Sequence, residues 1–103
     1  MDYLEKVMAL IAMSGAARSK AMEAIMLSKQ KDFKGAAELL ETASKELKDA
    51  HKVQTRLIQE EAGGTKQEIT LLMIHAQDHL MNAMTVKDMA KEFVELYEHT
   101  QKN

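Results

Sequence analysis

Residues 71–81 read Leu71-Leu72-Met73-Ile74-His75-Ala76-Gln77-Asp78-His79-Leu80-Met81, and they form a largely apolar run without a helix breaker. Two histidines and an aspartate interrupt this run at a spacing of about one helical turn. Burying an unpaired charge costs several kcal/mol. We therefore expect these side chains to be exposed, paired, bound to a metal or used in chemistry, and we expect the helix that carries them to organise the fold.

The composition of the whole chain favours helices. Its 103 residues include no proline and only four glycines, and they are rich in Ala, Leu, Met, Glu, Lys and Gln. These residue types are strong helix formers, so we predict an all-α fold in a single domain that spans residues 1–103. A chain of this length leaves much of its surface unburied, which favours oligomerisation.

Charge and cysteine content exclude several functions. The net charge of -2 gives no large field of one sign, so the sequence does not favour nucleic acid as a partner. The absence of cysteine excludes disulfides, thiolate metal sites and a cysteine nucleophile. The chain begins without the basic residues of a signal peptide, and no apolar run approaches the roughly 20 residues of a membrane span. We predict a cytoplasmic protein without direct membrane insertion.

Polar interruptions divide the chain into helices. We predict a first helix from about Asp2 to about Lys29. The break falls at residues 29–33, where Asp32 is a good N-cap and the apolar pattern restarts in a new phase. A second helix then continues to about Ala62.

The second interruption contains a glycine pair, Gly63-Gly64, which is typical of a helix stop. Thr65 and Glu68 have the spacing of a capping box, so we predict a third helix from about Lys66 to about Gln101. Three long helices with short connections indicate an antiparallel up-down-up bundle.

The first two helices carry distinctive faces. The small residues of the segment Ser14-Gly15-Ala16-Ala17-Arg18-Ser19 indicate close packing by a neighbouring helix, or else room for a ligand or partner. The second helix has a basic row, which is either a solvated face or a surface for an acidic partner: Lys45, Lys48, Lys52 and Arg56. Its predicted buried stripe is Ala36, Leu39, Leu40, Ala43, Leu47, Ala50, Val53, Leu57 and Ile58.

The third helix has two apolar directions. We expect one to face the first two helices: Leu72, Ala76, Ala83, Ala90, Val94 and Tyr97. The other, the outer seam, consists of Leu71, Ile74, Asp78, Met81, Thr85 and Met89. A helix with two apolar faces contacts two partners, so the outer seam predicts a homo-oligomer packed about this helix. Several copies of Asp78 would then converge, and a hard cation such as Mg²⁺ or protonation would offset their repulsion.

The polar cluster His75, Asp78 and His79 has three interpretations. The residues could bind one transition metal, although three ligands from one helix rarely converge well. They could form a structural hydrogen-bond network. Alternatively, His75 could be a nucleophile, because a neutral imidazole can accept an acyl or phosphoryl group.

Four segments together carry a family resemblance. They are His75-Ala76-Gln77-Asp78-His79-Leu80-Met81, Ser14-Gly15-Ala16-Ala17-Arg18-Ser19, Ala50-His51-Lys52-Val53-Gln54-Thr55-Arg56-Leu57-Ile58-Gln59 and Glu95-Leu96-Tyr97-Glu98. Across nearly the whole chain the sequence resembles the enzyme IIA component of the lactose/cellobiose (N,N'-diacetylchitobiose) class of the bacterial sugar phosphotransferase system. The motif itself matches fully; Asn82 follows it where the family often has threonine.

The resemblance implies a phosphocarrier that forms a homotrimer, a nine-helix bundle. It implies that the phosphohistidine of HPr phosphorylates His75 and that His75 passes the phosphoryl group to a cysteine of the IIB component. The resemblance also implies that this transfer serves the uptake and phosphorylation of a lactose-, cellobiose- or chitobiose-type sugar through the IIC membrane component. Asp78 would be shared among three protomers as ligand of one divalent metal, Mg²⁺ in the family. Within this frame His79, Gln77 and Gln54 are candidates to support the phosphoryl group.

Overall fold

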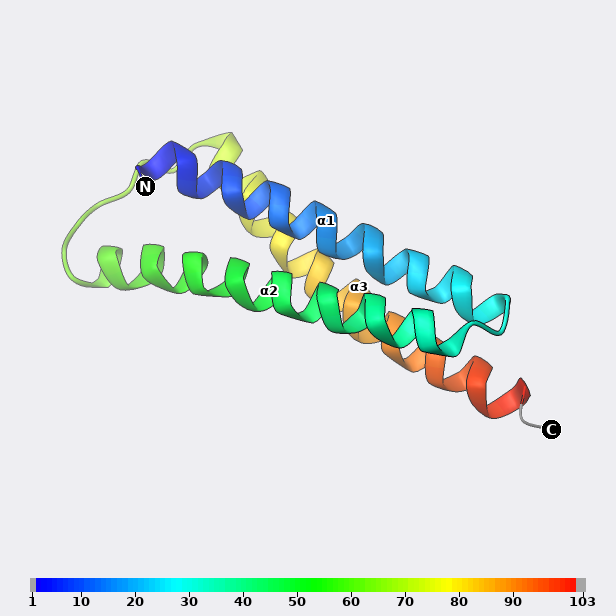
Figure 1. Cartoon of the computed structure of the whole chain (residues 1–103). Coiled ribbons are helices and arrows are strands. Elements are labelled where there is room, and N and C mark those ends of the chain that lie inside the picture. The colour runs from blue at the N-terminus through cyan, green and yellow to red at the C-terminus, as the bar shows by residue number, and fades with distance from the viewer. Residues whose placement is uncertain (1, 102–103) are drawn as a thin grey trace.

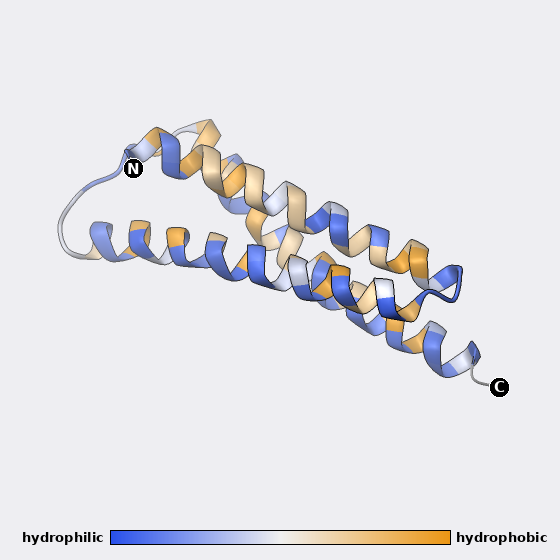
Figure 2. Cartoon of the chain, viewed as in Figure 1, coloured by the Kyte–Doolittle hydropathy of each residue, from blue (hydrophilic) through white to orange (hydrophobic). Residues whose placement is uncertain are grey.

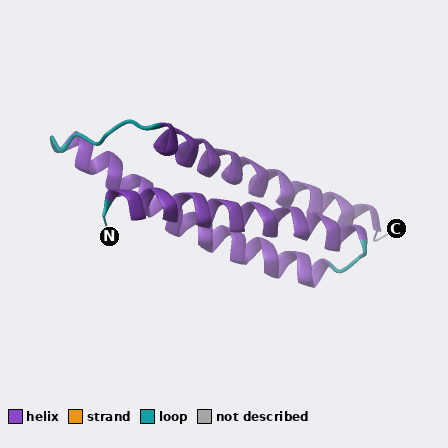
Figure 3. Ribbon diagram, turned by 90° about the horizontal axis from the view of Figure 1, so that it is seen from above, coloured by secondary structure: helices purple, strands orange, loops and turns teal. Residues whose placement is uncertain are grey.

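The structure is a computed structural model that describes residues 2–101. Three helices, α1 (Tyr3–Lys29), α2 (Phe33–Ala62) and α3 (Leu71–Gln101), run up, down and up in a rod of 57 × 19 × 19 Å (Figure 1). Seen from above, they lie lengthwise beside one another (Figure 3). Residues 2–101 contain no strand, which confirms the predicted all-α bundle. Within the same residues, no helix has the length and apolar character needed to cross a membrane.

Aspartate side chains start the first two helices. Asp2 accepts a hydrogen bond from the Glu5 N–H at 2.8 Å, and Asp32 accepts one from the Gly35 N–H at 2.9 Å. Each carboxylate satisfies a backbone donor that has no partner within its helix. In the turn between the helices, Lys31 has a φ of 66°. The predicted bounds of α1 and α2 are therefore confirmed.

The glycine pair ends α2 as predicted. Gly64 has a φ of 104°, in the left-handed region that favours glycine. The Thr65 N–H donates to the Glu60 carbonyl oxygen at 2.9 Å, which closes the end of the helix. This geometry reverses the chain without a break in the backbone hydrogen bonding of α2.

The predicted start of α3 is wrong by about five residues. The Thr65 and Glu68 capping box does not form, and α3 begins at Leu71. Thr70 caps it instead, because its Oγ1 accepts a hydrogen bond from the Met73 N–H at 3.1 Å.

Tertiary contacts explain why residues 65–70 do not join the helix. The Tyr3 hydroxyl donates to the Glu68 carbonyl oxygen, and the Gln67 amide donates to Glu60 Oε2 at 3.0 Å. The connection is thus tied to both α1 and α2 at the end of the bundle, where Figure 3 shows it crossing between helices. These bonds compete with the local bonds of an additional helical turn.

Alanines dominate the interior of the bundle. The largest fully buried apolar side chains are Val7, Leu10 and Leu80. The fully buried alanines are Ala17, Ala21, Ala24, Ala36, Ala43, Ala50, Ala76, Ala83 and Ala90. Small side chains let helix axes approach closely, and α1 packs extensively against both α2 and α3, whereas α2 and α3 contact each other less.

The predicted buried faces are correct in most positions. In α2, Ile58 is 57% exposed although it was placed in the buried stripe, and Leu72 of α3 is 37% exposed. Both lie near the end of the bundle where the connection between α2 and α3 crosses, so fewer neighbours cover them. Leu80 is fully buried, although the predicted inner face of α3 omitted it.

Many large apolar side chains remain exposed on this single chain. Figure 2 shows apolar residues along all three helices, and many of the large ones are exposed. On α3 the outer seam is exposed throughout, with Leu71 at 83% and Met81 at 51%. The other exposed large apolar residues are Leu4, Met8, Met22, Met26, Ile58, Ile69, Leu72, Ile74, Met89, Phe93 and Leu96.

Candidate functional site

His75 and His79 form a stacked pair on α3. Their ring centroids lie 5.6 Å apart and the ring planes are inclined by 15°. His75 is exposed, and His79 is half-buried toward α1. Residues four apart lie on the same side of a helix, which brings the rings together. The exposed His75 ring can meet a reactant, while His79 connects it to the rest of the bundle.

Gly15 makes room for His79. A Cβ placed on Gly15 would lie 3.3 Å from Nε2 of His79, closer than an ordinary contact. On the same segment Ser14 and Ala17 are fully buried. The small residues of α1 therefore serve two purposes: two of them pack inside the bundle, and Gly15 leaves space for an imidazole at the surface.

A surface depression of about 340 Å³ lies beside this contact, between α1 and α3. It is lined by Gly15, Arg18, Ser19, Met22 and His79. Arg18 is exposed and has no ion pair or hydrogen bond within residues 2–101. The sequence pattern indicated room for a ligand in the segment 14–19 but no individual role for Arg18.

Asp78 lies on the outer seam, as predicted. It is exposed, and its Oδ2 accepts a hydrogen bond from Asn82 Nδ2 at 3.3 Å. Its apolar neighbours Ile74 and Met81 are also more than half exposed. The carboxylate is therefore directed to a surface that this chain alone does not cover.

Gln77 lies on the other side of α3, toward α2. Its Oε1 accepts a hydrogen bond from Gln54 Nε2 at 2.6 Å, and its own amide contacts Met73 Sδ at 3.6 Å. Within one chain the structure thus joins the two glutamines to each other, and it does not bring them to His75 or His79.

One chain does not form a metal centre in the part that the structure describes. Residues 2–101 contain no group of three or more His, Asp or Glu side chains placed to hold a metal ion. The interpretation of His75, Asp78 and His79 as ligands of one metal is therefore wrong. A single carboxylate per chain suits a hard cation only if several copies bring their aspartates together.

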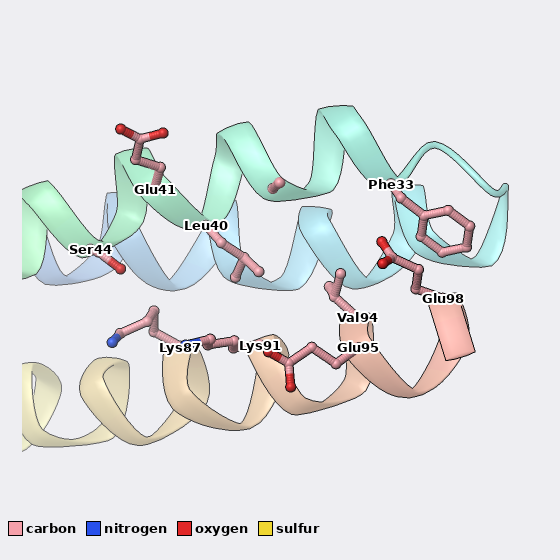
Figure 4. A pocket seen from close by; sticks show the side chains of 10 residues that line it. Phe33, Leu40, Glu41, Ser44, Lys87, Lys91, Val94, Glu95 and Glu98 are labelled. Atoms are coloured by element: carbon pink, nitrogen blue, oxygen red, sulfur yellow. The ribbon is translucent and has the colours of Figure 1, made fainter. Parts of the chain in front are cut away.

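A second depression, between α2 and α3, is chemically different. Figure 4 shows Leu40 and Val94 pointing into the space between the helices, with lysines and glutamates around them. Among its lining residues are Lys87, Lys91 and Glu95. Because its charges are of both signs and it contains no histidine, this depression shows no preference for an anion or a cation.

Comparison with known proteins connects the histidine pair to a family. The profile of the family described as "PTS system, Lactose/Cellobiose specific IIA subunit" matches residues 5–98. The chain belongs to this family. Its histidine pair, its depression beside α1 and its outer seam are thus features of a phosphotransferase system IIA subunit.

Individual members are closely similar to this IIA chain. The lichenan-specific phosphotransferase enzyme IIA component of Bacillus subtilis is 61% identical over 89 residues, which are 86% of this chain and 81% of that protein. The N,N'-diacetylchitobiose-specific EIIA component of Escherichia coli K12 is 44% identical over 94 residues, 91% of this chain and 81% of that protein.

Solved structures of the family have the same fold. The cellobiose-specific enzyme IIA of Bacillus anthracis matches with a TM-score of 0.95 at 47% identity, covering 100% of this chain and 95% of that one. The IIA(Chitobiose) chain in the IIA(Chitobiose)–HPr complex of Escherichia coli matches with a TM-score of 0.86 at 40% identity, covering 98% of each chain.

Proposed function

We propose that this chain is a cytoplasmic phosphocarrier of the sugar phosphotransferase system, with His75 as the residue that is phosphorylated. It receives the phosphoryl group from phospho-HPr and passes it to a cysteine of the cognate IIB component. The transported sugar is then of the lactose, cellobiose or chitobiose type, taken up through the IIC membrane component. The observation that carries the proposal is the exposed imidazole of His75, stacked on His79 in a member of the IIA family.

The proposed transfer needs only positioning and charge stabilisation. A ring nitrogen of His75 attacks phosphorus in line, a nitrogen–phosphorus bond forms, and the bond to the donor histidine breaks as that imidazole regains its electron pair. In the second transfer the IIB thiolate forms a sulfur–phosphorus bond and the bond to His75 breaks. Loose phosphoryl transition states place little demand on acid-base groups, so no nucleotide and no further nucleophile is required.

His79 is the proposed support for the group on His75. Its ring is held between the His75 ring and the backbone of α1 at Gly15, which limits its movement. An N–H of His79 can donate to a phosphoryl oxygen. The glutamines, which bond to each other on the α2 side, have this role only if another copy of the chain brings them near a histidine.

The proposal includes a homotrimer assembled about the outer seam of α3. The exposed Leu71, Ile74, Met81 and Met89 support it, because apolar side chains on a small bundle are stabilised by covering them. Three copies of Asp78 would then share one divalent cation, Mg²⁺ being favoured by an all-carboxylate set of ligands. The cation would offset the repulsion between the three carboxylates.

Phosphorylation with labelled phospho-HPr tests the nucleophile. We expect the chain to take up the label and His75→Ala to abolish the uptake, because the variant removes the only proposed bond to phosphorus. His51→Ala is the matched control: His51 is exposed on α2, where it lines a different depression with Lys87 and Asp88, and its variant is expected to keep full labelling. Persistent labelling of the His75→Ala variant would overturn the assignment.

A further inference from the structure

A phosphoryl group on His75 would lie near the carboxylate of Asp78. Asp78 lies three residues after His75 on the same helix, and residues at this spacing are neighbours on a helix surface. A phosphoryl group on His75 therefore adds negative charge beside a carboxylate. Such repulsion between like charges is stronger near a protein surface than in bulk water.

The other cations of α1 pair with residues of α2 or lie far from Arg18. Lys6 binds Glu60 at 2.9 Å, and Lys20 binds Glu46. Lys29 lines another depression between α1 and α3, but it is 11 residues beyond Arg18, about 16 Å along a helix at 1.5 Å per residue. In the described chain Arg18 is the unpaired cation that lines the same depression as His79.

The direction of the helices favours Arg18 further. α1 and α3 run in the same direction (Figure 1), and Gly15 marks the level at which α1 meets His79. Arg18 starts three residues beyond Gly15, about 4.5 Å along the axis. Helical side chains lean toward the N-terminus of their helix, so the long side chain of Arg18 leans back toward the level of His79, on which the His75 ring is stacked.

We propose that Arg18 binds oxygens of the phosphoryl group while that group is carried on His75, and that it thereby sets how strongly the chain retains phosphate. This inference rests on the proposed phosphocarrier function. Guanidinium groups match phosphate geometry with two parallel hydrogen bonds and remain charged at all relevant pH values. Among residues 2–101 of the unphosphorylated chain Arg18 has no ion pair or hydrogen bond, so its guanidinium is available when phosphate arrives.

The equilibrium of phosphoryl exchange with HPr tests this role. The equilibrium constant between the free phosphorylated and unphosphorylated proteins does not depend on how well they dock, because docking affects the forward and reverse rates equally. We expect Arg18→Gln to shift this constant toward phospho-HPr by about five- to tenfold, the effect of losing a charged contact at a partly screened site. Arg18→Lys should recover part of the shift, since lysine keeps the charge but not the paired geometry.

The only other arginine provides the control. Arg56 is exposed on α2, and no residue of α2 lines the depression beside His79, so Arg56→Gln makes the same change of charge outside that depression and should leave the equilibrium constant unchanged. An unchanged constant in Arg18→Gln, or an equal shift in both variants, overturns the role of Arg18 while phosphorylation of His75 stands. If the unsubstituted chain takes no phosphate from HPr, the proposed function itself fails.

Discussion

Replacing Gly15 with alanine should separate stability from phosphotransfer. Alanine is favoured over glycine inside a helix by about 1 kcal/mol. The new methyl group, however, would lie 3.3 Å from His79 Nε2, whereas carbon contacts are most favourable at about 3.5–4.0 Å. The imidazole must therefore recede by a few tenths of an ångström. Displacing the ring offsets part of the stabilisation that alanine gives to the helix. We therefore expect the free energy of unfolding to rise by about 0–1 kcal/mol.

The same displacement should slow phosphorylation of His75. Misplacing a catalytic group by about 1 Å can cost about 100-fold in rate, so a shift of a few tenths should cost about two- to sixfold. Urea unfolding followed by circular dichroism gives the stability. Rapid quenching of the reaction with labelled phospho-HPr gives the rate.

A double-mutant cycle identifies the contact responsible. In a His79→Ala background the Gly15→Ala methyl group meets no ring, so the full stabilisation of about 1 kcal/mol should appear. Gly15→Ala should also have no further effect on the phosphorylation rate in that background. Equal stability gains in both backgrounds, together with an unchanged rate when His79 is present, would refute the reasoning.

Three further predictions concern the outer seam, the basic row and the start of α3. Asp78→Leu should keep or strengthen the trimer, by about 1–4 kcal/mol, because apolar groups replace clustered charges; dissociation into single chains in sedimentation would contradict the proposed seam. Simultaneous replacement of Lys48 and Lys52 by alanine should leave the phosphorylation rate within about twofold, because both side chains are exposed. A larger loss of phosphorylation rate would indicate that the basic row binds an acidic surface of a partner. Thr70→Ala should lower the free energy of unfolding by about 0.5–2 kcal/mol, because the Met73 N–H loses its cap. If the Thr70→Ala variant and the unsubstituted chain unfold at the same urea concentration, contacts other than this cap determine where α3 starts.

The sequence was sufficient where structure depends on neighbours along the chain. Asp32 caps α2, and the glycine pair ends it, because both signals act over one helical turn. The start of α3 was mispredicted because Tyr3, more than sixty residues away, binds the backbone at Glu68. Such a bond depends on how the helix ends meet in space, which periodicity does not contain.

In the candidate site, too, the sequence predicts local features but not those that depend on how the helices pack. His75 and His79 are a local pair, and their spacing alone placed them on one side of a helix. The contact of His79 with Gly15, and the position of Arg18 beside it, depend on the rotation and sliding of α1 against α3. Gln77 lies two residues after His75, but 200° of helical rotation separates the two side chains, so within one chain it bonds to Gln54, and its support of the phosphoryl group stays a prediction.

Alanines dominate the interior of the bundle, whereas many leucine, isoleucine and methionine side chains are exposed. The stability of the fold should therefore depend on the concentration of the protein. Under the proposed assembly, much of the apolar area leaves water only when copies meet, so mass action contributes to the folding equilibrium. The melting temperature should then rise with the amount of protein present. A cell that synthesises little of the chain would hold a larger unfolded fraction, open to proteases, than one that expresses it abundantly.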